Sequence, residues 1–246
     1  MKLLLARKVL LTIALAACVW PQPLSAQKKE AGAEISQRMQ SFVEASQISG
    51  AVTLVAREGK TVYLSAVGQR NVESKNEMQN DTIFAIASMT KPVTATALMI
   101  LVDEGKVRLD DPVAKYIPEF KNAKLKGGDA PRREITLFDC LTHTAGLVGD
   151  QQCHDSLEAT GKMLAERPLG FHPGQRWQYS PGLNVIGRVI EVASGQKYEA
   201  FLKERIFDPL GMKDTTFHPD AEQQPRVVTL SLGGSSANSL PKCARR

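Results

Sequence analysis

The chain has 246 residues, of which 43% are hydrophobic and 23% charged, and its formal net charge is +5 at pH 7. A chain of this length and composition can bury one substantial core, which is typical of a globular domain. The sequence holds no block of basic residues interleaved with aromatic ones, so it gives no support to nucleic-acid binding.

The first 26 residues have the pattern of an export signal, in which basic residues precede an apolar run and a small-residue cleavage site. The apolar run, at 9–20, is too short for a helix that spans a membrane. Cleavage after Ala26 would remove three basic residues and lower the formal net charge from +5 to +2. We therefore expect an exported protein, periplasmic or secreted, with no membrane span.

Residues Leu15–Cys18 offer an alternative, because they resemble a bacterial lipobox that would anchor the protein through a lipid on Cys18. Val19 and Trp20 continue the apolar run, whereas a lipoprotein usually turns polar at this point. The cleaved signal is therefore the preferred interpretation. Both interpretations predict export.

After the signal, apolar residues at helical spacing predict a helix over 33–47, which Gly50 ends. Two β-rich runs follow, at 51–56 and 61–67, and a short turn that contains Gly59 joins them. This pattern predicts a β-hairpin.

A short β-like run at 82–87 leads into an apolar segment at 89–102. Because this segment is apolar nearly all round, it predicts a buried helix rather than an amphipathic one. Pro92 falls in its first turn, where the missing N–H costs little, and Gly105 ends it.

A polar, glycine-containing stretch at 121–133 predicts a surface loop before 135–141. Two further helices are expected at 183–192 and 198–207, separated by a Ser-Gly pair. The last stretch, 231–246, is rich in Gly, Ser and Ala and ends in basic residues, so we expect it to be disordered.

The quartet Ser88–Lys91 carries the clearest chemical signal. Residues three apart in a helix lie on one face, so the Lys91 amine can reach the Ser88 hydroxyl and take its proton. A helix N-terminus also offers free backbone N–H groups and the positive end of the helix dipole. An ordinary helix cap with a solvated lysine is the alternative, because the same spacing recurs at Ser25, Ser194 and Ser239.

The cysteines leave two interpretations open. Cys140, Cys153 and Cys243 follow the signal, and an oxidising compartment would permit one disulfide, with Cys140 and Cys153 as the most local pair. Together with His143 and His154 the local pair could be taken for a zinc site. The spacing fits no standard zinc finger, so we expect neither a metal nor another cofactor.

Several segments, in their order along the chain, resemble the serine β-lactamase and penicillin-binding-protein superfamily. The similar branch contains class C β-lactamases, D-alanyl-D-alanine carboxypeptidases and family VIII esterases, and the resemblance extends over roughly 33–219. The segments that carry it are 84–94, 105–120, 135–147, 173–180 and 209–215.

This resemblance implies an α/β fold of the α+β type. The expected domain, at 27–230, has an antiparallel sheet flanked by helices and a mostly helical region. The resemblance also implies that Ser88 is an acylated nucleophile, that Lys91 assists it, and that Tyr179 passes protons among nucleophile, leaving group and water. It makes His143 a structural residue in a turn.

The implied activity is that of a serine hydrolase whose partners are small-molecule esters, β-lactams or peptidoglycan-peptide-like amides. Relatives usually have asparagine two residues after the tyrosine, and Pro181 stands there in this chain, which moves the balance towards esters. Phe171 and Trp177 are expected in the core rather than in a substrate cleft.

The C-terminal strands of the superfamily, with a third motif and half of the oxyanion hole, are not recognisable in this sequence. The third motif consists of Lys, His or Trp, then any residue, then Gly. Lys242 is followed by Cys and Ala, so it does not fit this pattern. We therefore expect a truncated domain whose sheet has exposed edges and an uncovered apolar face. A module that is acylated without turnover and an inactive fragment are the alternatives to a working enzyme.

Overall fold

The structure is a computed structural model that describes residues 24–149, 155–229, 231–232 and 235–236. The chain divides into two compact units, Met1–Thr82 and Ile83–Arg246, which we describe one at a time. The predicted signal segment lies outside the described residues up to position 23, so export stays a prediction. Within the described ranges, no helix is both long and apolar enough to cross a membrane.

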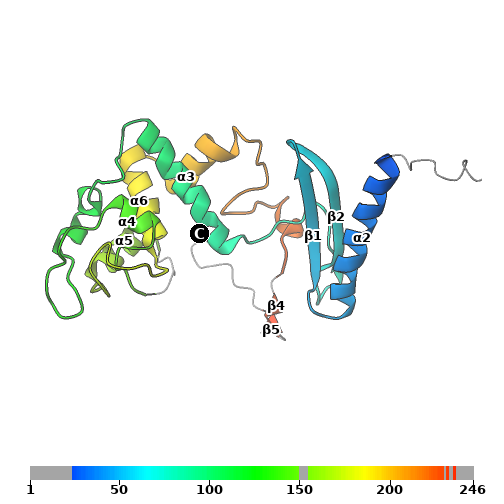
Figure 1. Cartoon of the computed structure of the whole chain (residues 1–246), viewed down its shortest axis with the longest axis horizontal. Coiled ribbons are helices and arrows are strands. Elements are labelled where there is room, and N and C mark those ends of the chain that lie inside the picture. The colour runs from blue at the N-terminus through cyan, green and yellow to red at the C-terminus, as the bar shows by residue number, and fades with distance from the viewer. Residues whose placement is uncertain (1–23, 150–154, 230, 233–234, 237–246) are drawn as a thin grey trace, which may run out of the picture. The chain divides into compact units, whose positions relative to one another are not determined.

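The first unit is a helix on a small antiparallel sheet, as Figure 1 shows. Its elements are α2 (Leu24–Glu44), β1 (Gly50–Arg57), β2 (Lys60–Asn71) and β3 (Asn76–Glu77). The strands lie in the order β1-β2-β3. The predicted hairpin is confirmed, and the predicted helix both begins and ends earlier along the chain than 33–47.

Polar contacts attach α2 to the sheet, because the Ser36 hydroxyl bonds to the Tyr63 hydroxyl and to Ser65 Oγ, the latter at 3.0 Å. The hairpin itself leaves large apolar side chains in solvent, among them Leu54 at 58% and Val62 at 51% exposure. The hairpin therefore has apolar side chains at its surface, and the truncation of the domain stays a prediction.

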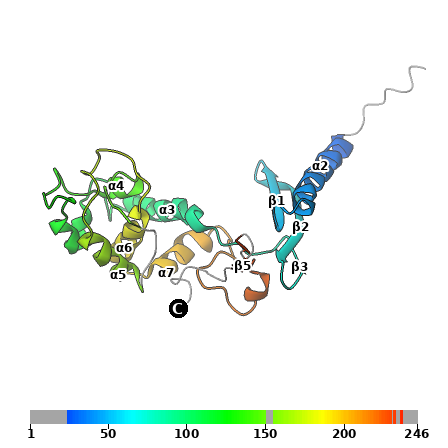
Figure 2. The same cartoon turned by 90° about the horizontal axis from the view of Figure 1, so that it is seen from below.

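The second unit is mostly helical, and Figure 2 shows its helices grouped together. A 3-10 turn, Ala87–Met89, leads directly into α3 (Thr90–Asp103). The later helices are α4 (Leu137–Leu141), α5 (Leu157–Glu166), α6 (Gly182–Ser194) and α7 (Tyr198–Leu202), and a π-helical turn, Lys203–Phe207, continues α7. Strands and helices together give the mixed fold class that the sequence predicted.

Helix α6 is the centre of the second unit, because α3, α4, α5 and α7 all pack against it. Its inner side chains Val185, Ile186 and Val189 are fully buried. The helix ends where expected, since Gly195 adopts a φ of 72°, a left-handed conformation that glycine tolerates best.

The prediction that the helix after Ser88 is buried all round is wrong in part. Leu98 and Leu101 are fully buried in α3, whereas Met99 is 39% exposed. Within the described residues α3 packs chiefly against α6 and α7, so one side of the helix faces solvent despite its apolar sequence.

The β-like run at 82–87 does not form a strand. Within this run, Ile83 alone forms a bridge, with Val227. The Ile83 N–H donates to the Arg226 carbonyl at 2.9 Å, and the Ile83 carbonyl accepts the Val228 N–H at 2.9 Å. The chain then leaves extended geometry, because Ala87 has a φ of 45°. Propensity alone could not reveal this left-handed residue directly before the serine.

Two short strands, β4 (Ser231–Leu232) and β5 (Ser235–Ser236), pair with each other in the segment for which disorder was predicted. Residues 237–246 lie outside the described part of the chain, and the prediction for them stays a prediction.

Candidate active site

Ser88 and Lys91 meet at the start of α3, in the arrangement that their spacing predicted. Ser88 lies in the 3-10 turn before the helix, and Lys91 occupies the first helical turn. Lys91 Nζ donates a hydrogen bond to Ser88 Oγ over 3.2 Å. The serine is exposed to solvent, so its hydroxyl is accessible to a substrate.

Tyr179 joins this pair from a distant part of the sequence. Its phenol O–H donates to Ser88 Oγ over 2.7 Å, although the two residues are separated by 91 positions. Lys91 Nζ also lies 4.8 Å from the centroid of the Tyr179 ring. The structure thus brings all three sequence-predicted site residues to one point.

The electrostatics of the cluster favour ionisation of the phenol. The hydrogen bond from the Lys91 ammonium, followed by that with the Ser88 hydroxyl, lowers the pKa of Tyr179 below its ordinary value. A stabilised phenolate can accept a proton from the serine hydroxyl. The arrangement can therefore generate a serine alkoxide without a histidine.

His143 is the residue whose place in the site the sequence did not reveal. It lies in a turn with a φ of 60°, as a structural residue would, but its ring packs against that of Tyr179 at 4.7 Å between centroids. Its Nδ1 accepts the Ser180 N–H at 3.2 Å, and its carbonyl accepts the Gln178 N–H at 2.9 Å. The one signal in the sequence was that Ser180 directly follows Tyr179, within the segment 173–180 that resembles the family; nothing in it pointed to His143.

Of the two aromatic residues predicted to lie in the core, Phe171 is buried and Trp177 is not. Phe171 is buried, with 6% of its surface exposed, as expected for a core residue. Trp177 is 66% exposed, so its expected burial is wrong. Its ring lies edge-on to that of His143 at 6.2 Å, beside the proposed chemistry rather than inside the core.

The start of α6 fixes the chain immediately after Tyr179. Pro181 caps the helix, and Gly182 lies so close to α4 that a Cβ there would be 2.5 Å from the Cys140 carbonyl oxygen. Any larger residue at position 182 would push these segments apart. The close approach therefore ties the tyrosine segment to a buried part of the unit.

Cys140 is a free, fully buried thiol, and burial raises its pKa. Its suggested disulfide partner Cys153 lies outside the described residues, as does His154. Across the ranges that the structure describes, there is no group of three or more His, Cys, Asp or Glu that could hold a metal ion.

An ion pair between the buried Asp139 carboxylate and the partly exposed Arg133 supports the turn that carries His143. Asp139 is 2% exposed, and Arg133 Nη2 donates to its Oδ1 over 2.9 Å. Thr136 N–H and the Thr144 hydroxyl donate to the same carboxylate, at 2.9 and 3.1 Å. Burial alone would raise the pKa of Asp139, but the hydrogen bonds from Arg133 and Thr136 outweigh it and hold the pKa below its ordinary value.

The serine-x-x-lysine quartet at Ser194 lies in different surroundings. Ser194 is the last residue of α6, and its hydroxyl donates to the Ile190 carbonyl at 2.6 Å. Ser25 lies near the start of α2, and Ser239 falls outside the described residues. The Ser88 hydroxyl, by contrast, accepts a hydrogen bond from a tyrosine hydroxyl, that of Tyr179.

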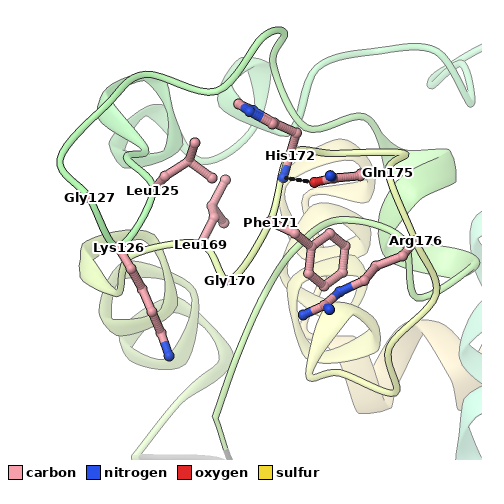
Figure 3. Close-up of a pocket in the computed structure, with 9 residues that line it drawn as sticks. All are labelled: Leu125, Lys126, Gly127, Leu169, Gly170, Phe171, His172, Gln175 and Arg176. Carbon is pink, nitrogen blue, oxygen red and sulfur yellow. Dashed lines mark hydrogen bonds between the residues drawn. The ribbon is translucent and has the colours of Figure 1, made fainter.

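A cavity of about 420 Å³ opens near the chain segment that leads to Tyr179, as Figure 3 shows. Arg176 lies over the Phe171 ring at 4.6 Å and donates to Gln178 Oε1 over 3.3 Å. Ser88, Lys91 and Tyr179 are not among its lining residues, so the cavity is separate from the cluster. The residues that line the cavity are Leu125, Lys126, Gly127, Leu169, Gly170, Phe171, His172, Gln175 and Arg176.

Comparison with curated proteins finds esterases and carboxypeptidases. The chain is 38% identical over 189 residues to Esterase EstB of Burkholderia gladioli, which covers 70% of this chain and 47% of that protein. It is 31% identical over 226 residues to lovastatin esterase of Penicillium rubens, covering 82% and 57%. It is 31% identical over 198 residues to the D-alanyl-D-alanine-carboxypeptidase/endopeptidase AmpH of Escherichia coli K12, covering 76% and 50%.

Solved structures agree with this fold. EstCE1, a hydrolase with promiscuous acyltransferase activity, matches with a TM-score of 0.74 and 27% identity over 83% of this chain and 57% of its own. The octameric penicillin-binding protein homologue from Pyrococcus abyssi matches with a TM-score of 0.66 and 29% identity, over 80% and 47%.

The chain spans about half the length of the curated relatives that it matches. The beta-lactamase family model matches residues 35–242, which is most of the sequence. The chain belongs to the beta-lactamase family.

Proposed function

We propose that this protein is a serine hydrolase that works through an acyl-enzyme on Ser88, with small-molecule esters as its preferred substrates. One observation carries the proposal: Ser88 Oγ lies within hydrogen-bonding distance of both Lys91 Nζ, at 3.2 Å, and Tyr179 OH, at 2.7 Å. A hydroxyl with a cation and a titratable phenol beside it meets the geometric requirement for an activated nucleophile.

In the proposed acylation step, the Tyr179 phenolate takes the proton of Ser88, and Oγ attacks the carbonyl carbon of the ester. The Lys91 ammonium stabilises the phenolate before this transfer. As the carbon–oxygen bond of the ester breaks, the phenol returns the proton to the leaving alkoxide. The acyl group is then held on Ser88 as a new ester.

Deacylation would use the same groups in reverse. Tyr179 takes a proton from water, and the resulting hydroxide attacks the acyl carbon. The bond to Ser88 Oγ breaks, the serine recovers its proton, and a carboxylic acid leaves. Ser88 lies directly before α3, so the positive end of the helix dipole would favour negative charge on the acyl oxygen.

The preference for esters rests on two supports. The first two relatives named above are called esterases. In addition, Pro181 occupies the position where many superfamily members carry asparagine, and its side chain offers no amide to bind a peptide or lactam carbonyl. β-Lactams and D-alanyl-D-alanine-like amides are the second substrate class, favoured by the similarity to AmpH.

Intact-mass spectrometry of the purified protein tests the proposal, with p-nitrophenyl butyrate and a fluorescent penicillin as probes. Hydrolysis with a transient adduct on Ser88 supports an enzyme, whereas a lasting penicillin adduct identifies a module that is acylated without turnover. Neither adduct nor hydrolysis identifies an inactive member of the fold and overturns the proposal. Ser88→Ala must abolish adduct and hydrolysis, and Ser194→Ala, at a second serine-x-x-lysine quartet, must not.

Tyr179→Phe tests the proton-transfer role with a minimal change of shape. We expect hydrolysis to fall by about 10²–10⁴-fold, the usual effect of removing a general acid–base group. Because the Tyr179 side chain is 44% exposed, the melting temperature should change little. A phenylalanine variant with the wild-type rate would exclude the phenol from the mechanism.

A further inference from the structure

His143 holds the chain on both sides of Tyr179. Its carbonyl oxygen accepts the N–H of Gln178 at 2.9 Å, and its Nδ1 accepts the N–H of Ser180 at 3.2 Å. The Ser180 hydroxyl lies at 3.2 Å from the same nitrogen, and the imidazole packs against the phenol ring. The residues before and after the tyrosine are thus fixed by one histidine.

The contact with Ser180 defines the protonation state of the imidazole. A backbone N–H can only donate, so Nδ1 must carry a lone pair, and the neutral ring then bears its proton on Nε2. A proton on Nδ1 would place two N–H groups against each other and break the contact. The Ser180 hydroxyl could still accept from a protonated Nδ1, but the bond that holds the backbone of Ser180 exists only while His143 is neutral.

We propose that neutral His143 is a positioning residue for Tyr179, and that its protonation loosens residues 178–180 and sets an acid limit on hydrolysis. This inference rests on the proposed function for its effect on rate. The hydrogen-bonding pattern of the imidazole itself does not depend on that function.

The surroundings of His143 keep the imidazole neutral at neutral pH. Burial, and then the positive charge of Lys91 at the start of α3, lower the pKa of His143 below its ordinary value near 6.5. The titratable group on the facing segment is the Tyr179 phenol. On the histidine's own side, the charged groups are Arg133 and Asp139, which are paired with each other.

The turn that carries His143 is anchored separately from its ring. Thr144 N–H donates to the Asp139 carbonyl at 2.9 Å, and Gly174 N–H donates to the Thr144 carbonyl at 2.9 Å. Removal of the imidazole should therefore leave the turn in place while it frees Ser180. Asparagine suits this position, because it tolerates the φ of 60° and its side-chain oxygen can accept in place of Nδ1 without titrating.

The test compares pH profiles of kcat/KM for p-nitrophenyl butyrate among wild type, His143→Ala and His143→Asn. We expect the alanine variant to lose about tenfold or more at neutral pH, as when a reacting group is displaced, and to approach the wild type in acid, where the protonated imidazole no longer accepts the Ser180 N–H. The asparagine variant should recover most of that loss at neutral pH. Its rate should still fall in acid as the Tyr179 phenolate is protonated, but it should lack the further fall below about pH 6.5 that protonation of His143 adds in the wild type. Replacing a purely structural histidine would not change this part of the profile.

An asparagine variant that falls in acid as the wild type does, or an alanine variant with the wild-type rate at neutral pH, would overturn the inference. If the alanine variant does not fold, the asparagine profile decides alone. If the wild type hydrolyses nothing, the proposed function fails, and NMR of the ring nitrogens decides the question of His143. Two findings together support the positioning role: at neutral pH a proton on Nε2 alone with a protected Ser180 amide, and in acid a second proton on Nδ1 with loss of that protection. A proton on Nδ1 at neutral pH refutes it.

Discussion

The two units of the molecule differ in how they bury apolar residues. In the second unit, Ile83–Arg246, which we call the helical unit, Leu98, Leu101 and Val185 are fully buried, together with many others. In the first unit, Met1–Thr82, which contains the hairpin, Met78 is the one buried apolar side chain among the described residues, while Leu54 and Val62 are more than half exposed. The helical unit thus has a core of its own, and the same unit contains Ser88, Lys91 and Tyr179.

Leu98→Ala should give the largest loss of stability, because it opens a cavity in the core of the helical unit. Replacing a fully buried leucine by alanine costs about 2–5 kcal/mol in the free energy of unfolding. Met99→Ala, one position further along α3 at a side chain that is 39% exposed, is the matched control and should cost much less. Urea unfolding followed by circular dichroism measures both, and equal losses would contradict the core that we describe.

Asp139→Asn should have the next largest effect. It removes a buried carboxylate on which Arg133, Thr136 and Thr144 converge, and we expect a loss of about 2–4 kcal/mol. Because the folded-state pKa of Asp139 is lowered, its stabilisation is present above the ordinary value near 3.9 and is lost as pH falls through the folded-state value.

Thermal unfolding between neutral and acidic pH tests this linkage. The stability of the wild type should fall faster in acid than that of Asp139→Asn, so the two curves should approach each other. Curves that stay parallel would show that Asp139 does not contribute through its charge.

Leu54→Thr should have the smallest effect. Leu54 pairs with Leu64 across the β1–β2 hairpin, and both side chains are more than 40% exposed. Threonine keeps a good strand propensity, so we expect a change within about 0.5 kcal/mol, as is usual at the surface. A loss above about 1.5 kcal/mol would show that this face is covered in solution and would erase the contrast between the units.

Local patterns predicted much of the fold. The alternating residues of the hairpin, and Gly195 at the end of α6, acted through neighbours in sequence, and these elements lie where they were expected. The strand predicted before α3 does not form, because the chain turns at Ala87, whose left-handed φ of 45° strand propensity does not predict. The exposure of Met99 likewise depends on what packs against α3.

The candidate site likewise contains residues that local sequence patterns predict and residues that they do not. Ser88 and Lys91 are one turn apart, so their contact could be derived from helix geometry alone. Tyr179 could be named only through the resemblance to a family, because no local rule links positions so far apart. The role of His143 depends on the orientation of one ring nitrogen towards Ser180, and sequence patterns do not encode that direction.

The hydroxyl of Ser88 meets Tyr179 only across 91 positions of chain. In an unfolded copy, or in a growing chain that has not yet reached α6, residue 88 is an ordinary serine. A covalent serine probe should therefore count folded molecules rather than total protein. The labelled fraction would serve as a direct titration of native protein in a mixed sample, with no need for a separate structural assay.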